Sequence, residues 1–136
     1  MKVDIKATNM ELTPSLNTYI NEKIGALEKF INIPMMHEDY QGTSPVEAFV
    51  EIAKTTKHHK HGNVFKAEIN IKVLGELLRA EANEWDMRIA IDEAKHLMER
   101  QLSKFKKEKQ AKFKKGAQTL KRLRSISPLA WFKKER

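Results

Sequence analysis

The fold of this chain is decided by residues 46–82, which read VEAFVEIAKTTKHHKHGNVFKAEINIKVLGELLRAEA. Apolar and polar residues alternate over 46–52 and again over 65–73, which is the period of a strand with one buried face. The polar stretch between them joins the two strands as a long hairpin, and Gly75 permits a tight turn into a third strand over 77–82. These residues therefore predict a three-stranded antiparallel meander.

One strand and one helix are predicted before this meander, and a second helix after it. Residues 3–7 alternate like a strand, and Thr-Pro at 13–14 predicts the start of a helix whose apolar stripe reaches about Ile31. Asp86 is a good N-cap for the second helix, whose apolar stripe reaches Phe105. The order β-α-β-β-β-α predicts an α+β two-layer sandwich, a four-stranded, antiparallel-rich sheet with both helices on one face.

Two interruptions divide the rest of the chain. Residues 32–45 contain two prolines among polar groups, which predicts a connecting loop. Beyond about residue 110 the helical pattern weakens, with Gly116 and Pro128 as breakers. We therefore expect one domain over 1–110, followed by a flexible basic tail over 111–136.

Charge is distributed unevenly along the chain. Residues 1–99 hold 12 Lys/Arg and 16 Asp/Glu, a formal charge of −4, whereas residues 100–136 hold 14 and 2, a formal charge of +12. Such a block attracts polyanions through Coulomb forces and counterion release, so nucleic acid is the leading partner and an acidic membrane surface the second. A solvated basic tail that only aids solubility is the remaining interpretation.

Composition and motifs exclude several classes of protein. The chain has no cysteine, which excludes a disulfide framework, a thiolate zinc site and a cysteine nucleophile. The amino terminus lacks the apolar stretch of a signal peptide, and no later segment reaches a membrane-spanning length. The sequence shows neither a glycine-rich phosphate loop nor a nucleophile beside a base. We expect a cytoplasmic protein with no enzymatic activity, no small-molecule substrate and no cofactor.

The strongest candidate site is the end of the second helix. Arg100, Lys104 and Lys107 are spaced four and three residues apart, so they share one helical ridge and can present a row of cations to phosphates. The helix dipole favours one or two cations at this end, but not so many. Because few exposed aromatic rings accompany them, we expect recognition through phosphates and shape rather than through stacked bases.

Two weaker clusters raise the question of metal binding or catalysis. His58, His59 and His61 are potential zinc, copper or nickel ligands, but the flanking lysines repel a cation and a flexible hairpin tip rarely preorganises a site. Carboxylates gather between Glu81 and Glu93, where the helix dipole and N-cap account for them without catalysis. We therefore predict neither a metal site nor a paired-carboxylate enzyme.

Several stretches of this sequence carry a family resemblance. They are MELTPSL at 10–16, Glu22-Lys23, LEKF at 27–30, LRAE at 78–81, Asp86-Met87 with Ala90-Ile91-Asp92, and ERQL at 99–102 with Lys104-Phe105-Lys106. Over about residues 1–110 the chain resembles the bacterial ribosome hibernation promoting factors, also called ribosome-associated inhibitor or subunit-interface proteins. The resemblance implies a domain like a double-stranded-RNA-binding fold with an added strand.

The resemblance also implies a place of action. The domain would lodge on the small ribosomal subunit between the subunits, cover the decoding region and silence translation in starved or resting cells. Eight cations would then contact ribosomal RNA phosphates: Lys23, Lys29, Arg79, Arg100, Lys104, Lys106, Lys107 and Lys109.

Two features depart from the family. Arg88 and Ile89 stand where the family usually has a tyrosine and a small residue. Residues 111–136 are too few and too basic to resemble the second domain of long members, so we expect a short-type factor, monomeric off the ribosome.

Other interpretations of the chain stay open. The apolar residues of the tail would allow an amphipathic helix on a membrane surface, but we prefer an extension that orders on ribosomal RNA. A generic double-stranded-RNA-binding module is the nearest rival, yet it would place its basic cluster at the start of its last helix, which is acidic here.

Overall fold

Residues 1–31, 46–55 and 64–135 are described by a computed structural model, with the backbone alone for Phe113 and residues 117–135. The predicted loop 32–45 and the three histidines of the hairpin tip lie outside this part of the chain. Met1–Ser103 forms one compact unit and Lys104–Arg136 another.

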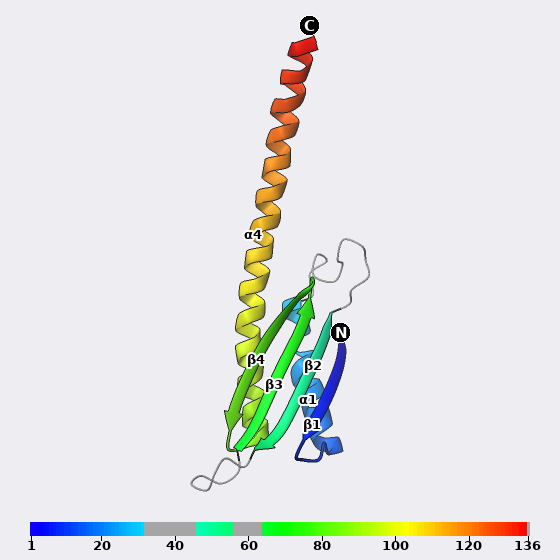
Figure 1. Ribbon diagram of the computed structural model, residues 1–136, viewed down its shortest axis with the longest axis vertical. Helices are drawn as coiled ribbons and strands as arrows, with labels where there is room; N and C mark the ends of the chain where they lie inside the picture. Colours follow the sequence, from blue (N-terminus) through cyan, green and yellow to red (C-terminus); the bar gives the residue numbers. More distant parts are fainter. Residues whose placement is uncertain (32–45, 56–63, 136) are drawn as a thin grey trace. The chain divides into compact units, whose positions relative to one another are not determined.

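Four strands form one mixed sheet in the order β1-β2-β3-β4 (Figure 1). Their bounds are β1 (Lys2–Thr8), β2 (Glu47–Thr55), β3 (Val64–Val73) and β4 (Glu76–Glu84). β2, β3 and β4 pair antiparallel in sequence order, while β1 pairs parallel with β2. The predicted meander and the four-stranded sheet are therefore confirmed.

A two-residue turn connects β3 to β4. Val73 pairs with Glu76, and between them Leu74 and Gly75 have φ angles of 50° and 76°. Positive φ at both positions is the geometry of a type I′ turn, whose twist matches that of the flanking strands. Gly75 adopts this conformation at no steric cost, whereas Leu74 is strained in it.

The core lies on one face of the sheet. Ile5, Val50, Ile69 and Ala80 lie side by side across the four strands, and the last three of these are buried. Figure 1 shows α1 and the first turns of α4 on the same side of this sheet. The helices bury Leu16, Ile20, Ile24, Met87, Ala90, Ile91, Ala94, Met98 and Leu102.

The first helix is shorter than predicted. α1 covers Pro14–Gly25 and a separate α2 covers Glu28–Ile31, so the single helix predicted to reach Ile31 is interrupted. The Leu27 amide donates to the Ile24 carbonyl at 2.9 Å, three residues back, which tightens the chain at this point. This tighter turn accompanies the complete burial of Leu27.

The second helix, α4 (Met87–Glu135), is longer than predicted. It begins at the expected cap, because Asp86 Oδ1 accepts a hydrogen bond from the Arg88 amide at 2.9 Å. It then continues through Gly116, which costs a helix only about 1 kcal/mol among strong helix formers such as lysine, glutamine and alanine. Within the part of the chain described, no helix combines the length and apolar character needed to cross a bilayer.

Candidate nucleic-acid interface

Arg100 is an unpaired cation of the Met1–Ser103 unit. Its side chain is exposed and forms no ion pair with any described residue. The preceding acid, Glu99, is held by Lys95, whose Nζ lies 3.0 Å from Glu99 Oε1. Burial raises the pKa of Glu99, but Lys95 and His96 outweigh it, so the pKa is lowered overall. Glu99 is thus neutralised by its own neighbours and leaves Arg100 free to bind an anion.

Residues 104–116, which we call the lysine segment, carry seven lysines and one glutamate. At 3.6 residues per turn, the lysines are spread around the helix instead of lining one stripe. The exposed ones are Lys104, Lys107, Lys112, Lys114 and Lys115, and the half-buried ones are Lys106 and Lys109.

The first three lysines of this segment lack an ion-pair partner among the described residues. Lys104, Lys106 and Lys107 form no ion pair with a described residue, and Lys109 Nζ lies 5.3 Å from the centre of the Phe105 ring. Such an excess of cations attracts a polyanion such as a phosphate backbone.

Lys23 is held in a cluster that joins α1 to α4. Tyr19 Oη donates a hydrogen bond of 2.5 Å to Asp92 Oδ1, and Lys23 Nζ lies 3.5 Å from the same oxygen. Burial, followed by the hydrogen bond to Asp92, raises the pKa of Tyr19 to about 12. Lys23 therefore carries a partly neutralised charge, unlike Arg100.

Arg88 completes this α1–α4 cluster and was not among the predicted site residues. Its Nη2 donates to Ser15 Oγ at 3.0 Å, and its guanidinium carbon lies 4.8 Å from the centre of the Tyr19 ring. The spacing of Arg88 and Asp92 by four residues on one helix was a signal for a shared face. Its partners on α1 could not be identified from that spacing, because they are distant in the sequence; Ser15, for example, lies 73 positions away.

Lys29 and Arg79 lie apart from each other. Lys29 is exposed on α2, where its Nζ lies 5.3 Å from the centre of the Phe30 ring. Arg79 lies on the sheet face opposite the helices, because it neighbours the buried Ala80 on β4. Its backbone carbonyl accepts a hydrogen bond from the Gln101 side chain on α4.

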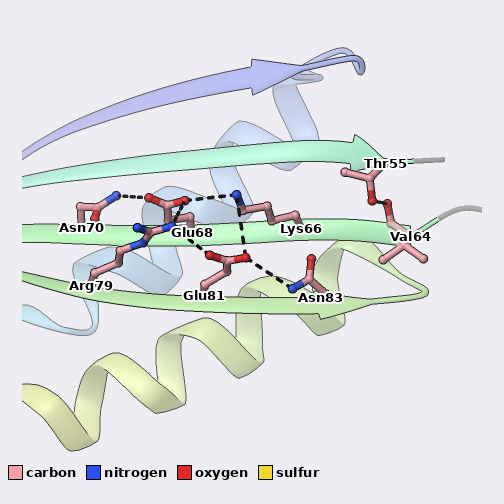
Figure 2. A network of polar contacts seen from close by, with 8 residues as sticks. All are labelled: Thr55, Val64, Lys66, Glu68, Asn70, Arg79, Glu81 and Asn83. Carbon is pink, nitrogen blue, oxygen red and sulfur yellow. Dashed lines mark hydrogen bonds and ion pairs between the residues drawn. The ribbon is translucent and has the colours of Figure 1, made fainter. Parts of the chain in front are cut away.

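The Arg79 side chain belongs to a charged network on the open face of the sheet (Figure 2). Its Nη2 lies 3.2 Å from Glu68 Oε2 and 3.0 Å from Glu81 Oε2. Lys66 Nζ lies 3.4 Å from Glu68 Oε2, and Asn70 donates to Glu68 Oε1 at 2.9 Å. The Asn70 hydrogen bond, then Arg79 and Lys66, lower the pKa of Glu68 against the effect of burial. The structure thus neutralises Arg79 and separates it from the cations of the helices.

The carboxylates between Glu81 and Glu93 have structural partners. Asp86 caps α4, Asp92 binds Tyr19, and Glu81 binds Arg79. Glu84 instead lies close to Glu93, which raises the pKa of the Glu84 carboxyl. Within the described ranges, no three metal-ligating side chains come together.

Sequence comparisons place the chain beside factors that act on ribosomes. The family described as Sigma 54 modulation protein / S30EA ribosomal protein matches residues 3–110. The chain is 31% identical over 106 residues to the ribosome hibernation promotion factor of Lactococcus lactis, covering 78% of this chain and 50% of the relative. It is 31% identical over 114 residues to the factor of the same name from Bacillus subtilis, covering 84% and 53%. The chain spans about half the length of these relatives.

Solved structures share the fold. The N-terminal domain of Protein Y from Thermus thermophilus matches with a TM-score of 0.59 at 23% identity, covering 77% of this chain and 99% of that domain. A ribosomal subunit interface protein from Coxiella burnetii matches with a TM-score of 0.51 at 21% identity, covering 78% and 98%. These likenesses confirm the predicted β-α-β-β-β-α architecture.

Proposed function

Because this chain belongs to the Sigma 54 modulation protein / S30EA ribosomal protein family, we propose that it binds the small ribosomal subunit and inhibits translation. Its relatives are hibernation factors rather than enzymes, in agreement with the absence of catalytic motifs from the sequence. The proposed site is the decoding region between the subunits, where the bound protein would keep resting ribosomes inactive.

One observation carries this proposal. Arg100, Lys104, Lys106 and Lys107 follow one another on α4 without an ion pair to any described residue. Unpaired cations of this density favour ribosomal RNA phosphates through counterion release, and they need no base-specific contact.

The eight predicted cations contribute unequally in this proposal. Arg100 and the lysines from Lys104 to Lys109 are the principal phosphate contacts, and exposed Lys29 is a separate, further contact. Lys23 and Arg79 first have to leave Asp92 and Glu68, so their contribution is smaller. Paired surface charges have part of their Coulomb attraction satisfied before a phosphate arrives.

Residues 1–110 act as the ribosome-binding domain in this proposal, and the basic residues 111–136 extend its contact with RNA. In this proposal the protein stays monomeric off the ribosome and works in the cytoplasm. It uses neither a cofactor nor a small-molecule substrate.

Co-sedimentation with purified bacterial ribosomes at low and moderate salt tests the proposal. The triple variant Arg100→Glu, Lys104→Glu and Lys107→Glu should lose binding at both salt concentrations. A matched triple reversal of Lys2, Lys6 and Lys72, exposed residues on the open sheet face, changes the net charge equally and should retain most of the binding.

Circular dichroism would establish that all of these proteins fold. If the folded wild-type protein failed to co-sediment, or if both triple variants bound equally, the proposed ribosome-binding surface would be wrong.

A further inference from the structure

An exposed tryptophan marks the corner where β4 leads into α4. Trp85 is 71% exposed, and Ile89, in the first turn of α4, is 37% exposed. Isolated exposed apolar residues are ordinary, but a tryptophan is rarely left so open to water. Tryptophan is also the residue type most enriched among those that dominate protein–protein contacts.

Two carboxylates flank these apolar side chains in the sequence. Glu84 directly precedes Trp85, and Glu93 lies one helical turn after Ile89. Glu84, at the end of β4, and Glu93, in the second turn of α4, lie close enough for Glu93 to raise the pKa of the Glu84 carboxyl. We call Glu84, Trp85, Ile89 and Glu93 the acidic corner.

The acidic corner differs from the ion-paired carboxylates of the Met1–Ser103 unit. Glu68, Asp92 and Glu99 each lie within 3.5 Å of a lysine nitrogen. Neither Glu84 nor Glu93 forms an ion pair with a described residue. An approaching cation would therefore find unneutralised acceptors beside an open aromatic ring.

We propose that the acidic corner docks a lysine- or arginine-rich segment of a ribosomal protein, an inference that rests on the proposed function. The carboxylates would accept charge-assisted hydrogen bonds from lysine or arginine, and the Trp85 ring would pack against a cation or its aliphatic stem. Ribosomal RNA is disfavoured there, because its phosphates would be repelled by both glutamates. In this proposal the acidic corner contacts a ribosomal protein, while the lysines of α4 contact RNA.

A charge reversal distinguishes these two kinds of surface. The double variant Glu84→Lys with Glu93→Lys should bind purified bacterial ribosomes about threefold or more weakly in co-sedimentation, because it repels a cationic segment. The matched double variant Glu11→Lys with Glu22→Lys adds the same charge at exposed positions near and on α1, and should bind as well as wild type or better. Equal gains in affinity for both double variants would overturn the proposal.

Photo-crosslinking identifies the partner directly. Benzoyl-phenylalanine in place of Trp85, in the full chain bound to purified ribosomes, should crosslink to a Lys/Arg-rich segment of a ribosomal protein, as read by mass spectrometry. The same group in place of Leu77, which is 62% exposed on β4, controls for indiscriminate reaction.

The outcomes separate this inference from the proposed function. Co-sedimentation with crosslinks only to RNA, or with none, would overturn the docking proposal and leave ribosome binding intact. Failure of the wild-type protein to co-sediment would overturn both.

Discussion

The Met1–Ser103 unit and the lysine segment differ in how far their cations are matched by carboxylates. In the unit, Lys23, Lys66, Arg79 and Lys95 each lie within 4.0 Å of a carboxylate oxygen. In the lysine segment, seven lysines share one glutamate. Paired charges are compatible with a packed fold, whereas an excess of one sign has to be matched by a partner. We therefore expect stability to reside in the first region and the proposed RNA affinity in the second.

The largest expected effect is on the stability of the first region. Ile69 is completely buried at the centre of the sheet, so Ile69→Ala should lower the free energy of unfolding by about 2–5 kcal/mol. Chemical denaturation followed by circular dichroism measures it. Leu77→Ala, at an exposed position of the neighbouring strand, is the control and should change stability by only about 0.5 kcal/mol. Similar losses for both variants would contradict the assigned core.

Deletion of residues 111–136 addresses the second region. It removes nine Lys/Arg and one Glu, so ribosome affinity should fall at least about tenfold at physiological salt, with a shallower salt dependence. The denaturation midpoint should change little. A truncated protein that binds ribosomes as tightly as the full chain would contradict the proposed role of these residues.

A smaller effect is expected from the charged network of the sheet. The pKa of Glu68 is lowered in the folded protein, so its contribution to stability is present above pH 4.5 and is lost as the pH falls through the lowered pKa. Glu68→Gln should therefore cost about 1–2 kcal/mol at neutral pH and weaken the acid dependence of unfolding. Glu22→Gln, an exposed substitution on α1, is the control and should change stability by at most about 0.5 kcal/mol.

The smallest effect concerns the contact between α1 and α4. Tyr19→Phe removes the donor to Asp92 and should cost about 1 kcal/mol, since the pair is partly exposed to solvent. The pKa of Tyr19 is about 12 in the folded protein against 10.0 for a free tyrosine, so its contribution is complete below pH 10 and is lost toward pH 12. An ultraviolet titration in which Tyr19 ionised like a free tyrosine would contradict the hydrogen bond.

The sequence was most informative where structure depends on near neighbours. Alternation over the strands and the caps at Thr13 and Asp86 are local, and all were predicted correctly. The break in the first helix before Leu27 was not predicted, because it depends on how the Leu27 side chain packs in the core. The continuation of α4 through Gly116 was also missed, because a breaker was given more weight than the helix formers around it.

For the candidate site, too, the sequence was informative about local features and not about contacts between distant residues. The excess of cations from Arg100 onward could be identified by counting charges along the chain. The neutralisation of Arg79 by Glu68 and of Lys23 by Asp92 could not, since each partner comes from a different strand or helix. A sequence shows where cations are plentiful, but the fold decides which of them stay free.

The parallel pairing of β1 with β2 has a consequence for the order of folding. Val3 pairs with Ala48, 45 positions away, whereas the turn at Leu74 and Gly75 joins β3 to β4 directly. Closing a long loop costs more chain entropy than closing a short one, so local hairpins form before distant pairings. On a translating ribosome, the first strand to be synthesised would therefore wait for residues 46–55 and join the sheet late.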